Sequence, residues 1–203
     1  MTKGGVIEIP QGRILLHACC APCSGAIVEY LVQHGCRPTV FYSNSNITPR
    51  EEYDIRLNEC IRYAKAYDLE IIADDYDHDS WSACAIGLEN EPERGARCLQ
   101  CFKFRLLRAA QYAATHGFDI LTTTLASSRW KSLEQVNEAG AWACEQVNAC
   151  HAEPPAAVIS PTRVTWWPQN WRKGGLQERR SEIIREQNFY NQLFCGCEYS
   201  HRP

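Results

Sequence analysis

Cysteine constrains this chain more than any other residue type, since it fills 12 of the 203 positions. An even count allows six disulfides, but disulfide-dense domains are usually small, secreted and poor in hydrophobic core. This chain begins without the apolar segment of a secretory signal, and it has no run of about 18 apolar residues that could span a bilayer. We therefore expect a cytoplasmic protein with no membrane segment, whose reduced thiols serve metal or redox chemistry.

Seven of the cysteines fall into three short motifs, and the other five stand alone. The motifs are Cys19-Cys20-Ala-Pro-Cys23, Cys98-Leu-Gln-Cys101 and Cys195-Gly196-Cys197. Residues three apart share one face of a helix, so both sulfurs of the second motif can reach one metal. Two thiolates from each of the first two motifs suit a tetrahedral zinc or an iron–sulfur cluster, and spacing alone does not choose between these.

The third motif differs in kind, because its glycine lets two thiols two residues apart turn towards each other. Such a pair suits a labile disulfide or a pair of metal ligands. Cys23 falls in the first turn of an expected helix, where it is either a third ligand or a packed thiol. Seven thiols exceed the need of one four-ligand site, and this surplus favours electron transfer over a purely structural zinc.

The charge distribution constrains the function of the chain less than its cysteine motifs do. The formal net charge is −3, so the whole chain does not resemble a typical nucleic-acid-binding protein. Residues 51–100 are strongly acidic, whereas residues 161–203 carry an excess of basic residues beside Trp166, Trp167 and Trp171. Such a tail could hold a nucleic-acid backbone and stack on bases. From charge alone we favour the simpler interpretation of a solvated helix face beside an aromatic part of the core.

Short apolar runs alternate with segments of helical periodicity along the chain. Strands are predicted at residues 13–18, 38–43, 69–73, 118–124 and 156–160, and helices at 22–34, 50–67, 79–87, 98–116, 132–148 and 176–188. This alternation predicts an α/β fold with a mostly parallel sheet and helices on both faces, Rossmann-like or HUP-like. We expect one domain over residues 1–203, with a C-terminal helical segment ending in Cys-Gly-Cys.

Ligands of such sheets bind beyond the carboxyl ends of the strands. The first predicted strand delivers Cys19, Cys20 and Cys23 to that edge. The other strands deliver polar groups there, namely Tyr42, Asn44, Asn46, Asp74, Asp75, Ser127, Ser128, Arg129 and Lys131. The carboxylates around Tyr76 could supply a hard ligand or an acid, although solvated loop charge is the commoner reason for such a group. His17 most simply lies at the edge of the core.

The ordered set of motifs resembles the QueH type of epoxyqueuosine reductase. The resemblance is carried by Leu15-Leu-His-Ala-Cys-Cys-Ala-Pro-Cys-Ser24, Tyr42-Ser-Asn-Ser-Asn-Ile-Thr-Pro49 with Glu51-Glu-Tyr53, Asp75-Tyr-Asp77, Arg97-Cys-Leu-Gln-Cys-Phe102, Thr122-Thr-Thr-Leu125 and Phe194-Cys-Gly-Cys-Glu-Tyr-Ser200. It runs from about residue 13 to residue 200, which is nearly the whole chain.

The resemblance implies a cobalamin-independent oxidoreductase for the last step of queuosine synthesis. It implies that an epoxide on the cyclopentane ring of a modified wobble guanosine in tRNA becomes an alkene. By motif, Cys19, Cys20, Cys98 and Cys101 are expected to hold a 4Fe-4S cluster. Cys195 and Cys197 are expected to form a redox-active pair or to bind an additional iron, with Asp75 as a weaker candidate for metal contact. The expected partners are tRNA carrying epoxyqueuosine and an unidentified electron donor.

Two departures from the family pattern affect substrate contacts more than the thiols. The run Ser127-Ser-Arg-Trp-Lys131 replaces a Ser-Pro-His/Arg-Lys type of run, and the segment 144–162 is unfamiliar. Two other functions stay open at this point. One is an ATP-dependent tRNA sulfur-transfer enzyme of the PP-loop kind, although the loop after the first strand offers thiols instead of a glycine cradle. The other is a zinc-stabilised nucleic-acid or protein adaptor, which leaves Cys195-Gly196-Cys197 unexplained.

Overall fold

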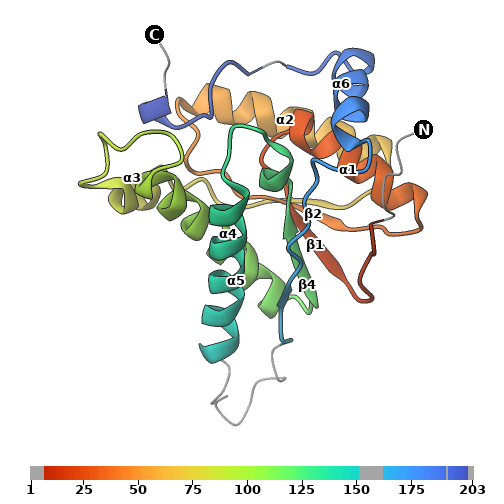
Figure 1. Ribbon diagram of the computed structural model, residues 1–203, viewed down its shortest axis with the longest axis horizontal. Helices are drawn as coiled ribbons and strands as arrows, with labels where there is room; N and C mark the ends of the chain where they lie inside the picture. The colour runs from red at the N-terminus through yellow and green to blue at the C-terminus, as the bar shows by residue number, and fades with distance from the viewer. Residues whose placement is uncertain (1–6, 151–161, 191, 201–203) are drawn as a thin grey trace.

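A parallel sheet of five strands forms the centre of the computed structural model, which describes residues 7–150, 162–190 and 192–200 (Figure 1). The strands are β1 (Ile14–His17), β2 (Thr39–Tyr42), β3 (Ile71–Ala73), β4 (Ile120–Thr123) and β5 (Thr165–Trp166), in the spatial order β3-β2-β1-β4-β5. Strands β1 and β4 are buried along their whole length. That burial explains why their sequences are short continuous apolar runs instead of alternating ones.

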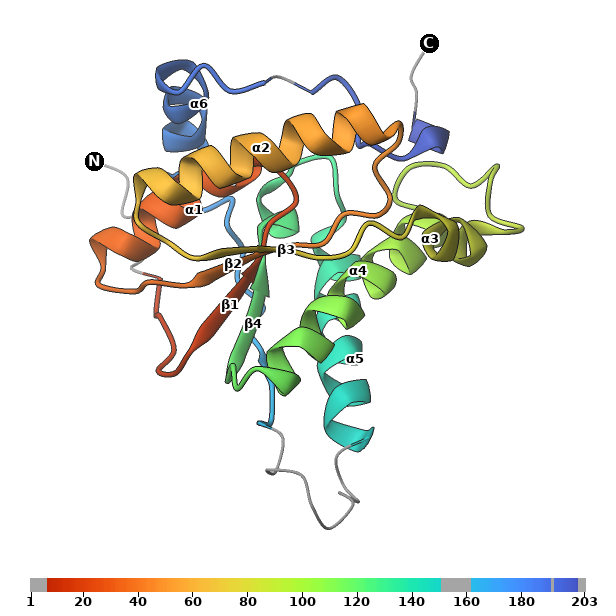
Figure 2. The same cartoon turned by 180° about the vertical axis from the view of Figure 1, so that it is seen from behind.

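Helices cover both faces of this sheet. They are α1 (Ala21–Gln33), α2 (Arg50–Ala66), α3 (His78–Ala85), α4 (Ala96–Thr115), α5 (Leu133–Cys150) and α6 (Leu176–Glu186), with the short 3-10 turns η1 (Thr124–Ser127) and η2 (Glu198–Ser200). Seen from behind, α1 and α2 lie over one face, and α4 and α5 lie over the other (Figure 2). The predicted α/β class, the parallel sheet and the placing of helices on both faces are therefore confirmed.

Most predicted boundaries agree with the structure to within a few residues. Helix α4 begins at Ala96, two residues before the predicted start, so that both Cys98 and Cys101 lie within its first two turns. The strand predicted at residues 156–160 lies outside the described residues. The edge position beside β4 is taken by Thr165–Trp166, a two-residue strand in which Thr165 pairs with Ile120.

The segment after α6 is not helical where the last cysteine pair lies. Helix α6 ends at Glu186, and the chain then runs over α2 towards α3 before it forms η2 (Figure 1). Cys195, Gly196 and Cys197 belong to this crossing segment, so the C-terminal helix precedes the motif and does not contain it. Among the helices that the structure describes, none combines the length and the apolar character needed to cross a membrane.

Candidate metal centre

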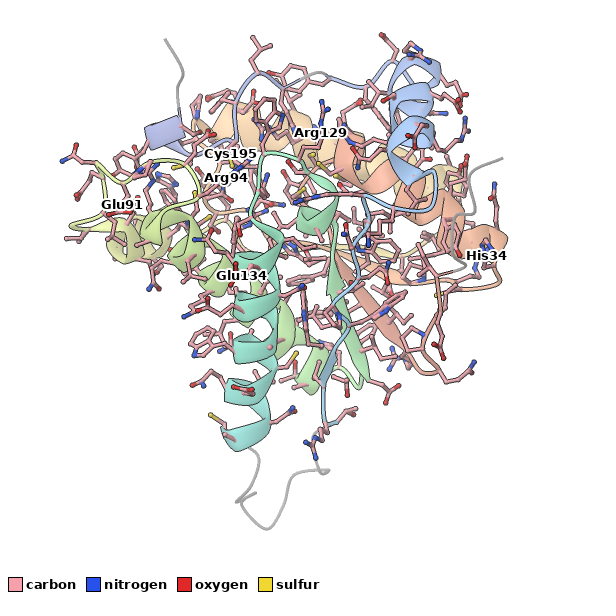
Figure 3. All side chains as sticks on the ribbon, in the orientation of Figure 1. His34, Glu91, Arg94, Arg129, Glu134 and Cys195 are labelled. Atoms are coloured by element: carbon pink, nitrogen blue, oxygen red, sulfur yellow. The ribbon has the colours of Figure 1, made fainter. Side chains whose placement is uncertain are left out.

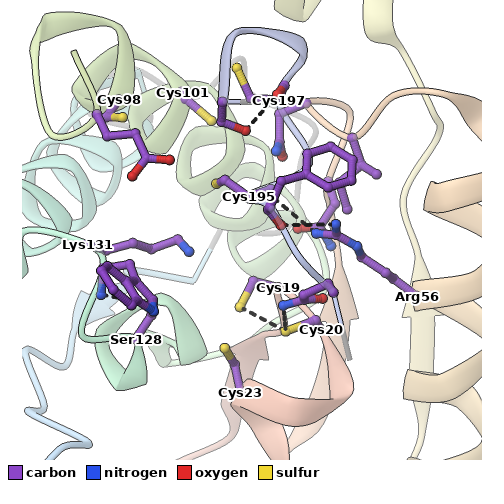
Figure 4. A pocket seen from close by; sticks show the side chains of 18 of the residues that line it. Cys19, Cys20, Cys23, Arg56, Cys98, Cys101, Ser128, Lys131, Cys195 and Cys197 are labelled. Atoms are coloured by element: carbon purple, nitrogen blue, oxygen red, sulfur yellow. Dashed lines mark hydrogen bonds between the residues drawn. The ribbon is translucent and has the colours of Figure 1, made fainter. Parts of the chain in front are cut away.

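A cavity of about 360 Å³ opens beyond the carboxyl ends of the strands. All seven clustered cysteines line it, namely Cys19, Cys20, Cys23, Cys98, Cys101, Cys195 and Cys197. They come from the β1–α1 turn, from the start of α4 and from the segment after α6. The close-up view places Cys19, Cys20 and Cys23 on one side, Cys98, Cys101 and Cys197 on the opposite side, and Cys195 between them (Figure 4). All twelve cysteines of the chain are free thiols.

The first three thiols form a compact group at the start of α1. The sulfurs of Cys19, Cys20 and Cys23 all lie within 4.8 Å of one another, which is a spacing that can hold a metal ion. Cys20 is the N-cap of α1, and a proline follows in the first turn. The unpaired N–H groups of that turn favour negative charge on the sulfurs. The sequence left open whether Cys23 is a third ligand or a packed thiol, and the structure places its sulfur beside those of Cys19 and Cys20.

Hydrogen bonds within the group shift the pKa values of Cys20 and Cys23 in opposite directions. Hydrogen bonds from the Cys19 and Cys20 thiols, supported at longer range by Lys131, hold the pKa of Cys23 well below its ordinary value. The hydrogen bonds of Cys20 with Cys19 and with Cys23, together with burial, raise the pKa of Cys20. Outside the group, the Thr124 hydroxyl donates to Cys19 Sγ at 3.3 Å and Gln192 Nε2 donates to Cys20 Sγ at 3.0 Å. Donors directed at sulfur stabilise the thiolate form, which is the form that binds a metal.

The second pair lies on the cavity side of α4. Cys98 and Cys101 are three residues apart, which places both on one face of the helix. Cys98 is partly buried and accepts the backbone N–H of Arg94 at 3.3 Å, whereas Cys101 is buried. Burial raises the pKa of both thiols, and Arg105 opposes that effect at Cys101. The first two motifs therefore line one cavity, and their joint ligation of one cluster stays a prediction.

A buried ion pair holds the third motif in place. The Arg56 guanidinium pairs with Glu52 at 2.6 Å, and both side chains are almost fully buried. The same guanidinium donates to the carbonyl oxygens of Phe194 at 3.2 Å and Cys195 at 3.0 Å (Figure 4). Thr48 N–H donates to the carbonyl of Gly196 at 2.9 Å. The loop after β2 and the helix α2 thus fix the backbone from which Cys195 and Cys197 project.

Positive charge surrounds the thiols, although the chain as a whole is acidic. Six cationic side chains line the cavity against the single carboxylate of Glu93, and they are Arg56, Arg94, Arg97, Arg105, Lys131 and Arg180. Arg105 is only 2% exposed and donates to the Ser43 carbonyl. Burial alone lowers the pKa of Lys131, but the nearby sulfurs of Cys195, Cys19 and Cys23 reverse this effect and raise it. The cations therefore offset the negative charge that thiolates bring into the cavity.

Three polar groups lining the cavity are buried without a hydrogen-bond partner among the described residues. They are the whole amide of Asn46, the Oε1 atom of Gln192 and the Nε atom of Arg180. Asn46 is 1% exposed. Buried polar atoms normally find partners, and unpaired ones at a cavity leave room for a hydrogen bond to a bound group, an ion or water. The residues present thus fit a polar or ionic cofactor held among the sulfurs.

Asp75 and His17, which the sequence analysis also considered, do not line the cavity. The Asp75 side chain is exposed, and this residue is not among those that line the cavity. Its neighbour Asp74 instead accepts from Ser43 Oγ at 2.6 Å and pairs with Arg108. His17 is fully buried between Thr123 Oγ1 and the Ser43 carbonyl. Burial, with Arg105 nearby, lowers the pKa of His17 to about 3, so it is a neutral histidine of the core.

Sequence reasoning missed several cavity residues that a helical projection could have found. Arg97 and Arg105 lie four residues before and after Cys101, so all three share one face of α4. Gln192 lies in an irregular segment and gave no signal. Two residues of the basic tail have structural roles, because Arg179 pairs with Glu29, Glu182 and Glu186, and Trp171 is buried in the core. Of its cations, Arg180 lines the cavity.

Comparison with known proteins agrees with this arrangement. The family model described as epoxyqueuosine reductase QueH matches residues 14–203. Proteins named epoxyqueuosine reductase QueH are similar to the chain: that of Haemophilus influenzae is 42% identical over 97% of this chain and 75% of its own length. The Acinetobacter baylyi protein is 43% identical over 97% of this chain and 84% of its own, and the Thermotoga maritima protein is 27% identical over 94% and 91%.

Proposed function

Because the chain belongs to the QueH family of epoxyqueuosine reductases, we propose that its clustered cysteines carry electrons to an epoxide of a modified nucleoside in tRNA. The protein is an oxidoreductase of that family. Its proposed substrate is tRNA carrying epoxyqueuosine at the wobble position. Converting the epoxide to an alkene releases its oxygen as water and consumes two electrons and two protons. The enzyme therefore needs a redox centre and a reductant.

One observation carries the proposal: seven free thiols from three distant segments line a single cavity. In the proposed arrangement Cys19, Cys20, Cys98 and Cys101 hold a 4Fe-4S cluster, which supplies single electrons when bound. The unpaired amide of Asn46 and the donors Thr124 and Gln192 suit the sulfurs of such a group. This fit supports a metal–sulfur cofactor over an empty hydrophobic pocket.

In the proposal, Cys195 and Cys197 provide the second redox group that the reaction needs beside the cluster. A cluster transfers one electron at a time, whereas the epoxide takes two. The pair serves either as a dithiol that is oxidised to a disulfide, releasing two electrons and two protons, or as ligands of an additional iron. Arg56 and Glu52 hold this segment over the cavity. Asp75 has no part in the proposal, because its exposed side chain lies outside the cavity lining.

The remaining residues hold charge and protons in the cavity. Lys131 and Arg105 keep two positive charges beside the sulfurs and so favour reduced, negatively charged states there. The Lys131 ammonium also brings exchangeable protons into the cavity at Nζ. We propose a cytoplasmic location, where tRNA is modified and thiols stay reduced, and an electron donor that reaches the mouth of the cavity.

The proposal is tested by the iron, inorganic sulfide and zinc content of anaerobically purified protein, together with its visible absorption spectrum. Four or more irons with matching sulfide and a brown chromophore are expected. Reduced protein should then convert epoxyqueuosine in tRNA to queuosine, as measured on nucleosides released by digestion. One zinc without sulfide, persisting after anaerobic reconstitution, would contradict the cluster and favour a zinc-stabilised adaptor. ATP-dependent thiolation of tRNA by the same protein would instead favour the sulfur-transfer enzyme.

A further inference from the structure

The mouth of the cavity is marked by two exposed apolar side chains. Trp130 is 61% exposed and Leu193 is 89% exposed, and both line the cavity. A residue that meets both the cavity and solvent lies where the cavity opens. Large exposed apolar side chains of this kind often mark a binding site.

The loop that carries Trp130 is held firmly. Arg94 donates to the carbonyl oxygens of Arg129 at 2.8 Å and Trp130 at 3.2 Å. Arg172 donates to those of Ser128 at 2.6 Å and Lys131 at 2.7 Å. Two guanidinium groups thus fix four successive carbonyls of residues 128–131. Figure 3 labels Arg94, Arg129 and Cys195 in the same upper region of the view, and Arg94 and Cys195 both line the cavity. The exposed indole therefore projects from a fixed backbone and not from a loosely held loop.

The charge around the mouth suits a nucleic acid. Arg94 and Arg129 are exposed, and Arg94 lines the cavity together with Lys131 and Arg180. The exposed guanidinium groups of Arg94 and Arg129 can bind phosphate groups of a bound strand. Proteins that hold unpaired nucleotides combine such cations with an aromatic face on which a base stacks.

We propose that the indole face of Trp130 stacks on the nucleobase of the wobble nucleoside and so holds its epoxide-bearing ring inside the cavity. This inference rests on the proposed function. The cyclopentane ring is a substituent of the base, so when the ring enters among the thiols the base stays outside, at the mouth. Trp130 is the aromatic side chain that is both largely exposed and part of the cavity lining among the described residues. It is a substrate-binding residue that positions the base, and it takes no part in electron transfer.

The first test measures binding of epoxyqueuosine-containing tRNA to the cluster-loaded protein, anaerobically and without reductant, so that it does not depend on turnover. Trp130→Ala is expected to weaken binding roughly 5- to 150-fold, the range that stacking on one base contributes. Trp130→Phe should retain most of the affinity, because a phenyl ring still offers an aromatic face. Ile86→Ala is the matched control: Ile86 is 76% exposed but does not line the cavity, and its variant should bind like the unmodified protein.

Turnover separates this inference from the proposed function. In Trp130→Ala the KM for the tRNA should rise by a similar factor while kcat changes less than about threefold, since the thiols are untouched. Unchanged KM and affinity in that variant, or equal losses in the Ala and Phe variants, would overturn the stacking role. A wild-type protein that binds the tRNA but never reduces it would contradict the proposed function and leave the binding comparison valid.

A second test identifies which base is stacked. Anticodon stem–loops keep epoxyqueuosine at the wobble position and carry 2-aminopurine at its 3′ neighbour, and fluorescence is measured in the saturated complexes. The Trp130→Ala and wild-type complexes should be equally bright, because the indole stacks on the wobble base and not on the labelled one. A brighter Trp130→Ala complex would show that the indole stacks on and quenches the neighbour, and would overturn the assignment to the wobble base.

Discussion

At the scale of single residues, the chemistry depends on charge held beside sulfur. The sulfurs of Cys19, Cys20 and Cys23 lie within 4.8 Å of one another at the positive end of α1. The charge of Lys131 acts on Cys19 and Cys23, and that of Arg105 acts on Cys19. Placing cations in a partly buried site costs free energy unless negative charge compensates them. The arrangement therefore makes sense when the sulfurs are thiolates, as they are when they bind a metal.

Substitution of single cysteines distinguishes the proposed cluster ligands from the proposed redox pair Cys195 and Cys197. Cys98→Ala is expected to lose most of its iron and sulfide, because removing one of four thiolate ligands weakens the binding of the cluster. Cys195→Ser should keep the cluster and lose turnover. Cys36→Ala is the control, since this half-buried thiol lies outside the cavity lining. Full iron and sulfide in Cys98→Ala would refute the ligand assignment, and a fully active Cys195→Ser would refute the redox or ligand role of that residue.

Lys131 tests the role of positive charge in the cavity. Lys131→Met should lower kcat by roughly tenfold or more, since a charge directed into a partly buried site contributes strongly to stabilising charge during reaction. Lys131→Arg keeps the charge and should lose less. Lys173→Met, at an exposed lysine outside the cavity lining, should have wild-type activity. Equal activity of the Met and wild-type enzymes under steady-state conditions would show that this charge is not needed.

At the scale of elements, the segment after α6 depends on α2 for its position. Arg56 and Glu52 lie one turn apart on α2, and their buried pair also engages Tyr190, Phe194 and Cys195. Removing one member of a buried ion pair commonly costs about 3–5 kcal/mol, because the other charge stays buried without a partner. The last cysteine motif is thus held by long-range contacts and not by a helix of its own.

Glycine at position 196 is needed both for backbone shape and for space. Its φ is +107°, and an added Cβ would lie 2.8 Å from Ile47 Cγ1. Gly196→Ala should therefore displace the two neighbouring thiols, lower the free energy of unfolding by about 1–3 kcal/mol and abolish most turnover. Gly35→Ala is a matched control, because its φ is +77° but nothing lies within 4 Å of the added Cβ.

Gly196→Ala and Gly35→Ala are compared by urea unfolding and by steady-state turnover. Both should lose stability through backbone strain, but only Gly196→Ala should lose activity, since Gly35 ends α1 away from the cavity. An active Gly196→Ala enzyme would show that the Cys-Gly-Cys backbone tolerates displacement.

At the scale of the whole molecule, the cavity joins three segments that are far apart in sequence. In the proposed arrangement, a group bound to Cys19, Cys20, Cys98 and Cys101 would cross-link the β1–α1 turn to the start of α4. The unfolded chain does not hold these thiols together, so binding free energy adds to folding stability.

Cluster loading is therefore expected to raise the melting temperature. One kcal/mol shifts Tm by roughly 2–4 °C in a chain of this size, and we expect a rise of at least about 5 °C between apo and anaerobically reconstituted protein. Calorimetry under nitrogen measures the difference. In Cys98→Ala, reconstitution should leave Tm unchanged, whereas equal Tm values for apo and loaded wild-type protein would contradict the cross-link.

Much of this protein follows from its sequence alone. The alternation of apolar runs and helical segments specifies the parallel α/β fold, because each element's period is local. The three cysteine motifs predict metal or redox chemistry, and the end of the first predicted strand places the first motif at the ligand-binding edge of the sheet. These features depend on residues near one another in the chain.

Other features exist only in the tertiary structure. The approach of Cys195 and Cys197 to the cavity depends on Arg56 and Glu52, which lie about 140 residues earlier in the chain. The exclusion of Asp75 from the cavity lining, the burial of Arg105 and the unpaired amide of Asn46 likewise depend on packing between distant segments. Composition and spacing carry no record of such contacts, because burial and electrostatic neighbours are set by the folded chain as a whole.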